Sequence, residues 1–433
     1  FHSDIDDKLE DNNDDLRSGS IILIDIENFK LINNSHGLEA GDLLLKQFAL
    51  RLRTYCADKV LSISRLNGDQ FGLFSLSNNR VATSIFARNL LRFMNKPYKT
   101  AEGKEFFITL SIGVSLSPHD ADDSRELFTC AELALDRAKS SERNSIEYYN
   151  KEMKFQAKRI DLLRQRMALA ITNNAFEAYY QPIVHTKTKQ LSHFEALARW
   201  HDDVLGQVYP DEFIPISEEF GLIQGIGQCV TSKAIDGLVS INKDLTTPVG
   251  LSINRSAREF MSDDDYCSNI VDMINRSNID PHLVSIELTE SMMVNNESVA
   301  KIQLEHLRSL GFSISMDDFG TGFSSLGYLK KYPFDYIKID RSFVADMAEQ
   351  QEAHILVKTI IDMAHNFGMQ VIAEGVETLE QLEMLEILNC DYVQGYLFSP
   401  PMEKEKLFAY ITSHHGGQIL SDEQENAPLA LAN

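Results

Sequence analysis

The chain has 433 residues, of which 43% are hydrophobic and 24% are charged, and its formal net charge is −23. A single compact domain rarely grows beyond roughly 250–300 residues, so the length predicts two domains. The negative charge argues against a nucleic acid polymer or an anionic membrane as partner, because both are usually bound by basic surfaces. The acidity indicates either a solvated surface or acids that are concentrated in metal sites.

The cysteines and the apolar runs bear on the cellular compartment. Five scattered cysteines without a Cys-x-x-Cys pair are typical of reduced thiols in a cytoplasmic protein. The sequence has neither a signal peptide nor an apolar run long enough to cross a membrane. Because it starts at Phe1 without a methionine, we expect a fragment whose full-length form could carry an N-terminal sensor or membrane region.

The chain changes its pattern near residue 150. The first part predicts an α/β sandwich in the order βαββαβα, with strands at 20–29 and 106–116, helices at 38–55, 81–95 and 126–141, and a hairpin around Asn67-Gly68-Asp69. The charged stretch 151–173 lacks glycine and proline and predicts a helix. We therefore place a first domain at 1–149, a connecting helix at 150–174, a second domain at 175–413 and a disordered tail at 414–433.

The second domain alternates short apolar strands with helices. Eight strands are expected, at 177–184, 193–200, 248–254, 283–290, 312–320, 335–340, 370–377 and 391–398. Eight strands over about 220 residues are the number and length of a (β/α)8 barrel, in which the carboxyl ends of the strands meet at one rim.

Seven of those strands carry a polar side chain at or near the carboxyl end: Glu195, Asn254, Glu287, Asp317 with Asp318, Lys338 with Asp340, Glu374, and Gln394. Any one of them could be a solvated strand end, but so many acids at one rim repel each other unless cations are present. Carboxylate and amide oxygens suit Mg²⁺ or Mn²⁺. The adjacent Asp317 and Asp318 could bridge two cations about 3.5–4 Å apart, the usual separation in phosphoryl displacement. Lys338 could form a salt bridge or orient the attacking water.

These residues stand in motifs that resemble the EAL family of cyclic di-GMP phosphodiesterases. Glu195-Ala196-Leu197, followed by Arg199, resembles the signature motif of this family. The resemblance runs from about residue 176 to residue 402. It includes Gln181-Pro182-Ile183, Asn254, Glu287-Leu288-Thr289-Glu290, Asp317-Asp318-Phe319-Gly320-Thr321-Gly322, Lys338-Ile339-Asp340 and Glu374-Gly375-Val376-Glu377.

The resemblance implies a modified (β/α)8 TIM barrel that hydrolyses cyclic di-GMP to linear pGpG with two Mg²⁺ or Mn²⁺ ions, and a homodimer. The implied metal ligands are Glu195, Asn254, Glu287, Asp317 and Asp318. Lys338 and Glu374 resemble the residues that manage the attacking water, and Glu290 belongs to a lid over the site. The implied substrate contacts are Gln181, Leu197, Arg199, Asp340, Glu377 and Gln394.

The first domain resembles the GGDEF family of diguanylate cyclases, which implies a nucleotidyl-cyclase-like α/β sandwich, here truncated at its N-terminus. Its signature loop has Asn67 in place of a glycine and Gln70 in place of a glutamate. A side chain at position 67 would crowd a loop that must approach phosphates closely. The Arg-x-x-Asp inhibition motif expected at 58–61 is absent from the sequence.

Other positions of the first domain retain the family pattern. The resemblance implies metal ligands at Asp25 and Asp69, guanine contacts at Asn33 and Asp42, and triphosphate contacts at Lys139 and Arg143. We therefore expect a domain that makes cyclic di-GMP poorly or not at all but could bind GTP as an allosteric ligand. A relict domain that serves only in dimerisation or folding remains an alternative.

Three other functions are conceivable for the whole chain. A catalytically silent cyclic di-GMP receptor would be expected to lack one of the ligands or the base, and this sequence keeps them all. A net diguanylate cyclase is disfavoured by Asn67 and Gln70. A purely structural barrel does not account for the acidic rim.

Overall fold

The computed structural model describes residues 5, 18–57, 59–101, 103–141, 144–243, 245, 247–256, 265–289, 297–320, 329 and 331–413. The chain divides into two compact units, residues 1–162 and 163–433. Helix α6 (Lys151–Thr172) crosses this division. Among the described residues, no helix combines the length and the apolar character needed to span a membrane.

The first unit is built on a mixed five-stranded sheet in the order β2-β3-β1-β6-β7. Its strands are β1 (Gly19–Ile26), β2 (Ser62–Arg65), β3 (Gln70–Ser75), β6 (Leu110–Ser117) and β7 (Ile146–Tyr148), and β4 (Tyr98–Lys99) pairs separately with β5 (Glu105–Phe106). Its helices are α2 (Phe29–His36), α3 (Leu38–Cys56), α4 (Arg80–Met94) and α5 (Ser124–Ser140).

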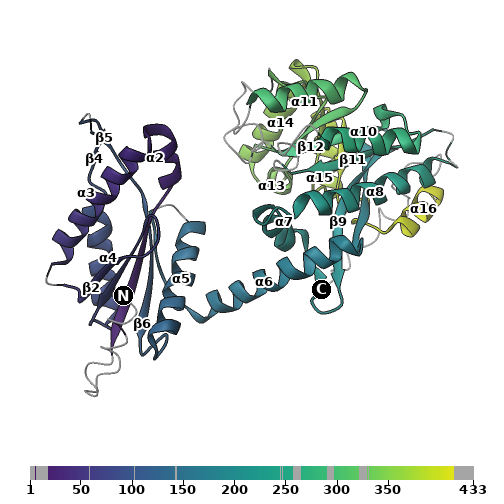
Figure 1. Ribbon diagram of the computed structural model, residues 1–433. Coiled ribbons are helices and arrows are strands. Elements are labelled where there is room, and N and C mark those ends of the chain that lie inside the picture. The colour runs from purple at the N-terminus through teal and green to yellow at the C-terminus, as the bar shows by residue number, and fades with distance from the viewer. Residues whose placement is uncertain are drawn as a thin grey trace. The chain divides into compact units, whose positions relative to one another are not determined.

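Alternate residues of β1 face two separate cores on the two sides of this sheet. Ile22 and Ile24 pack in one core with α3 and α4, and Ile21 and Leu23 pack in the other core with α5. This alternation follows from the two-residue period of a strand. Figure 1 shows the helices on both faces, so the predicted α/β sandwich is confirmed.

The second unit is a closed eight-stranded barrel. Its strands are β8 (Phe176–His185), β9 (Leu191–Asp202), β11 (Gly250–Arg255), β12 (Val284–Thr289), β13 (Ser313–Phe319), β14 (Tyr336–Ile339), β15 (Gln370–Ala373) and β16 (Tyr392–Gln394). The short strand β10 (Gly206–Val208) pairs antiparallel with the end of β9. Neighbours from β9 to β16 are parallel, and β8 closes the ring between β16 and β9. The predicted barrel is therefore confirmed.

The barrel departs from a regular alternation of strand and helix at its first strand. Strand β8 runs antiparallel to both of its neighbours. The turn at 186–190, in which Lys189 has a φ of 58°, joins β8 directly to β9. So short a connection can reverse the chain but cannot provide the crossover that a parallel pair requires. The other seven strands keep their carboxyl ends at one rim.

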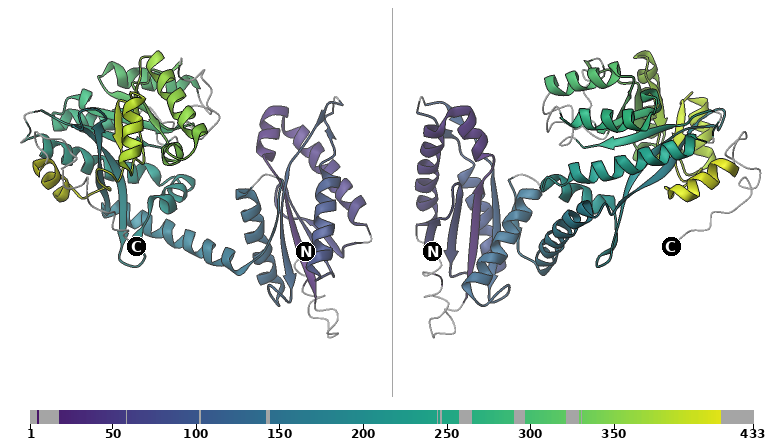
Figure 2. Two further views of the ribbon diagram at one scale, coloured as in Figure 1. Left: turned by 180° about the vertical axis from the view of Figure 1, so that it is seen from behind. Right: turned by 45° about the vertical axis from the view of Figure 1, so that its right-hand side comes forward.

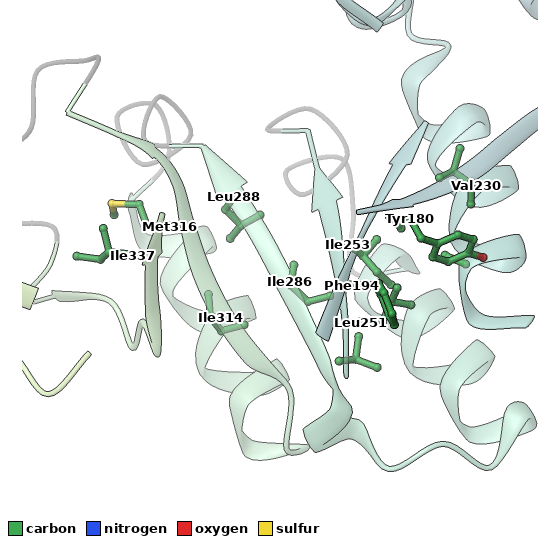
Figure 3. Close-up of a cluster of buried hydrophobic side chains, with 14 of the residues drawn as sticks. Tyr180, Phe194, Val230, Leu251, Ile253, Ile286, Leu288, Ile314, Met316 and Ile337 are labelled. Carbon is green, nitrogen blue, oxygen red and sulfur yellow. The ribbon is translucent and has the colours of Figure 1, made fainter. Parts of the chain in front are cut away.

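Helices cover the outside of the barrel: α7 (Pro210–Glu219), α8 (Ile223–Asn242), α10 (Asp265–Ser277), α11 (Glu297–Ser309), α13 (Arg341–Asp346), α14 (Gln351–Asn366), α15 (Leu379–Ile387) and α16 (Lys404–Ser413), with a short 3₁₀ turn at Pro281–Leu283. Figure 2 shows these helices around the strands. The apolar row from Ile337 across Ile286 to Leu251 and Phe194 forms much of the core (Figure 3). This core fixes the strands whose ends carry the polar residues.

Candidate active site

The parallel strands bring the predicted acidic residues together. Asn254 lies level with Glu287 on the adjacent strand, and Gln181 of the antiparallel β8 lies opposite Glu195. Glu195 does not end its strand as expected, because β9 continues to Asp202 along its long pairing with β8. The side chain of Glu195 nevertheless reaches the same site, since residues two apart on a strand share a face.

Lys338 occupies the centre of this site. Its side chain is 1% exposed, and its Nζ lies 2.6 Å from Glu374, 2.8 Å from Glu287, 3.3 Å from Asp317 and 3.4 Å from Glu195. Four carboxylates therefore surround one ammonium group. A buried cluster of this kind keeps a large excess of negative charge unless further cations bind.

Three amide side chains orient the carboxylate of Glu195. Asn254 donates to Glu195 Oε1, and Gln394 donates to Glu195 Oε2 at 2.6 Å and to Gln181 Oε1 at 3.0 Å. Gln181 in turn donates to the backbone carbonyl of Ser399 at 3.2 Å. These bonds link strands β8, β9, β11 and β16, so the position of Glu195 is set by the barrel itself.

A β-bulge places two consecutive aspartates at one site. The register between β13 and β14 shifts between Met316 and Phe319, and Asp318 has a φ of 53°. Neighbouring residues of a regular strand face opposite sides, but a bulge with one residue in the left-handed region can turn both toward the same side. Asp317, Asp318 and Glu374 consequently offer carboxylate oxygens that all lie within 4.8 Å of one another.

Two glycines directly follow functional residues at the ends of β15 and β16, where a larger side chain would clash. Gly375, which follows Glu374, has a φ of 67° and leaves no room for a side chain beside Arg341. A Cβ at Gly395, which follows Gln394, would lie 2.0 Å from the carbonyl oxygen of Val376. These positions let the chain turn sharply behind both functional side chains.

Burial and charge shift the pKa values of the cluster in opposite directions. Burial raises the pKa of Glu374 to about 8 and the pKa of Glu287 well above its usual value. Burial would also raise the pKa of Glu195, but Lys338 and the amides of Gln394 and Asn254 hold it below the ordinary value. Burial disfavours the charged form of Lys338, yet the surrounding carboxylates keep its pKa well above the usual range.

The residues present fit divalent cations. The donors are carboxylates and an amide, which are ligands for Mg²⁺ or Mn²⁺. Glu287 Oε1 is buried and has no hydrogen-bond partner among the described residues, so one ligand oxygen is left for another group. Burial and the charge of Asp317 raise the pKa of Asp318. A bound cation would lower this pKa again.

The other predicted substrate contacts lie outside the group of carboxylates around Lys338. Arg199 and Leu197 follow Glu195 on the same face of β9 toward the rim. Asp340 caps helix α13 by accepting from the backbone N–H of Ser342 at 3.0 Å, and the exposed Glu377 makes no described contact with Lys338. Glu290, most of the lid loop and the tail 414–433 lie outside the described residues.

One residue of the site was missed in the sequence. His193 lies two residues before Glu195 on β9, and its buried ring packs against Tyr336 and Tyr392. Burial and the nearby Lys338 lower its pKa to about 4, so it stays neutral. The two-residue period of the strand could have predicted its place beneath the cluster.

The structure describes all but one of the predicted GTP contacts in the first unit. Lys139 Nζ donates to Asp25 Oδ2 at 2.6 Å, and burial raises the pKa of Asp25. A cavity of about 370 Å³ is lined by Asp42. Asn33 Oδ1 is buried without a hydrogen-bond partner among the described residues, close to Gly41 on α3. Arg143 lies outside them.

The signature loop of the first unit is a hairpin turn between β2 and β3. The backbone N–H of Gln70 donates to the carbonyl of Asn67 at 2.7 Å, and Arg65 donates to the carbonyl of Gly68, which has a φ of 48°. Asp69 follows in the same turn. The predicted hairpin is therefore present.

Comparisons with known proteins agree with this fold. Residues 164–401 match the EAL domain family, and residues 1–145 match the family described as diguanylate cyclase, GGDEF domain. The chain is 36% identical over 90% of its length to the signaling protein YkoW of Bacillus subtilis, covering 49% of that protein. It is 31% identical over 91% of its length to the cyclic di-GMP phosphodiesterase NbdA of Pseudomonas aeruginosa, covering 50% of that protein.

A solved structure gives the same result for the barrel. The PaMucR phosphodiesterase in complex with c-di-GMP has a TM-score of 0.55 and 32% identity, and the match covers 57% of this chain and 99% of that one. The chain therefore belongs to the EAL domain family, with a GGDEF region before the EAL domain. It spans about half the length of these two curated relatives.

Proposed function

We propose that the chain is a metal-dependent phosphodiesterase that hydrolyses cyclic di-GMP to linear pGpG. The observation that carries this proposal is the complete set of carboxylates around Lys338 at the carboxyl rim of an EAL barrel. Two relatives support the proposal. NbdA is named as a cyclic di-GMP phosphodiesterase, and the PaMucR phosphodiesterase was solved in complex with c-di-GMP.

The residues that would hold two Mg²⁺ or Mn²⁺ ions are Glu195, Asn254, Glu287, Asp317 and Asp318. When bound, such ions neutralise phosphate charge and lower the pKa of a coordinated water. The side chain of Glu374 is 19% exposed at the edge of the cluster and contacts Lys338, so it can accept the proton of an attacking water there. The charge of Lys338 opposes the effect of burial on the pKa of Glu374 and can stabilise negative charge on the phosphate during displacement.

Product analysis tests this function. The purified chain is incubated with cyclic di-GMP and Mg²⁺ or Mn²⁺, and pGpG is followed by chromatography. We expect turnover with either metal and binding without turnover in Ca²⁺, which prefers longer bonds and looser geometry. Binding in every metal without any product would favour the silent receptor instead.

Two substitutions test the assigned roles. Asp317→Ala should abolish turnover, because it removes one of the carboxylates that would hold the metal ions. Glu374→Gln keeps the shape but not the basicity, so kcat should fall by at least about 100-fold with little change in substrate affinity. A near-normal kcat in Glu374→Gln would remove this residue from its role.

We also propose that the first unit binds GTP but does not synthesise cyclic di-GMP. The support for binding is the Asp42-lined cavity and the unpartnered Asn33 Oδ1, and the support for lost synthesis is Asn67 and Gln70 in the turn. Calorimetry with GTP and Mg²⁺ should show binding without any cyclic di-GMP product. No heat at millimolar GTP would leave a relict domain.

The same proposal includes a homodimer, which rests on the family resemblance alone. Light scattering at micromolar concentration should give twice the mass of one chain. A fully active monomer would contradict it.

A further inference from the structure

Arg199 stands at the rim without a carboxylate partner. Among the residues that the structure describes, its guanidinium makes no ion pair. Its Nη1 donates to the carbonyl of Ala198 at 2.8 Å, and its guanidinium carbon lies 5.6 Å from the ring centre of Tyr179. Burial lowers the pKa of Arg199, but a guanidinium group keeps its charge in proteins. A half-buried arginine of this kind is a charge left available for an anion.

A carboxylate nevertheless lies in the position to pair with it. Glu177 of β8 is the direct cross-strand partner of Arg199 on β9. Opposite residues of an antiparallel pair share a face at a separation where unlike charges attract. Instead, Glu177 Oε1 accepts from Lys233 Nζ of α8 at 2.6 Å. Lys233 is fixed in turn by the carbonyl of Asn174 at 2.9 Å.

The neutral partner of Arg199 is also held in place. The hydroxyl of Tyr179 donates to Glu403 Oε1 at 2.8 Å, and this bond raises the pKa of Tyr179. An aromatic face attracts a guanidinium group without neutralising it, so the arginine keeps its charge for a ligand. Glu177, Tyr179, Lys233 and Glu403 line one cavity of about 440 Å³.

We propose that Tyr179, Lys233 and Glu403 are positioning residues that keep Arg199 free of the competing carboxylate of Glu177, so that Arg199 can bind a substrate phosphate. Lys233 draws Glu177 away, and Glu403 anchors the ring of Tyr179 under the guanidinium. The proposal rests on the proposed function, because it takes a phosphodiester as the ligand of Arg199.

A rescue experiment tests the role of Lys233. Lys233→Met releases Glu177, which then pairs with Arg199 and competes with the phosphate. We expect KM for cyclic di-GMP to rise about three- to tenfold with kcat within twofold of wild type, because the lost interaction binds the ground state and the transition state equally. Adding Glu177→Gln to Lys233→Met should restore KM, because the competing charge is gone. Lys404→Met is the matched control, since Lys404 lines the same cavity but donates to Ser240.

A second series tests the aromatic partner. Tyr179→Leu removes the ring and should raise KM about fivefold or more, whereas Tyr179→Phe keeps the ring and should raise it by less than threefold. Dissociation constants measured by calorimetry in Ca²⁺ give the same comparison without turnover. An inactive wild-type chain would therefore contradict only the proposed function. An unchanged KM and Kd in Lys233→Met, or a double variant as impaired as Lys233→Met, would overturn the inference.

Discussion

Lys338 contributes to the stability of the barrel as well as to the proposed reaction. Its ammonium group is buried among four carboxylates, one of which, Glu287, is fully buried. Removing one partner of a buried ion pair is costly, because the remaining charges have lost both water and their counter-charge. Three of these carboxylates, Glu195, Glu287 and Asp317, are also proposed metal ligands, so a bound cation and Lys338 should both offset their negative charge.

This leads to a prediction on Lys338→Met. In EDTA the variant should lose about 3–5 kcal/mol of unfolding free energy, the range for an unpaired buried charge. Mg²⁺ or Mn²⁺ should restore part of the loss, whereas turnover should stay absent. Urea unfolding with and without metal measures both. Lys358→Met is the control, since Lys358 pairs with Asp362 on the surface; equal stability of the two variants in EDTA would contradict the prediction.

At the scale of the element, the sequence predicts the positions of the strands but not the irregularities of their pairing. Most of the strands and their terminal polar residues could be predicted, because these strands are short apolar runs that end in a polar residue. Glu195 is the exception, since β9 continues beyond it to Asp202. The bulge at Asp317 and Asp318 could not, because it depends on the register between β13 and β14. The antiparallel direction of β8 depends on a turn whose left-handed Lys189 carries no glycine signal.

The bulge yields a prediction about the backbone of Asp318. A residue other than glycine in the left-handed region costs roughly 1–2 kcal/mol, and aspartate tolerates it better than alanine. Asp318→Ala should therefore unfold at a lower temperature than Asp318→Gly, although both lack the carboxylate and should be equally inactive. Calorimetric melting in EDTA gives the comparison. A more stable alanine variant would show that position 318 does not need the left-handed conformation.

Helix α6 gives a second prediction at this scale. Arg166 pairs with Asp202 at the end of β9 at 2.7 Å, and Asp202 also accepts from the backbone N–H groups of Val204 and Leu205. Although burial raises the pKa of Asp202, these partners hold it below the usual value. A carboxyl with a depressed pKa stabilises the fold above its unfolded pKa of 3.8 and loses this effect as pH falls further.

Asp202→Asn should therefore lower the melting temperature by a few degrees at every pH from 8 down to about 5, and the difference from wild type should shrink only below about pH 4. Asp272→Asn serves as control, because Asp272 pairs with Arg276 on an exposed helix face. A difference between Asp202→Asn and wild type that closed already at pH 6 would contradict the depressed pKa.

At the scale of the whole molecule, the proposed binding of GTP in the first unit bears on the proposed hydrolysis in the second. Helix α6 contributes Met153 to a core of the first unit and Leu163 and Met167 to the core of the barrel. A ligand that favours one state of the first unit can shift hydrolysis only by its differential affinity for two states. Thermodynamic linkage then requires the effect on binding to be mutual.

The last prediction uses this reciprocity. If GTP tightens the binding of cyclic di-GMP by a given factor, then cyclic di-GMP must tighten the binding of GTP by the same factor. We expect a factor of about 5–150, the usual range for coupled sites, when both constants are measured by calorimetry in Ca²⁺ to prevent turnover. Asp42→Ala should abolish the GTP effect while leaving hydrolysis without GTP unchanged, because Asp42 lies in the first unit. GTP that binds without changing the affinity for cyclic di-GMP would show that the first unit does not act as a sensor, since a ligand with equal affinity for both states shifts nothing.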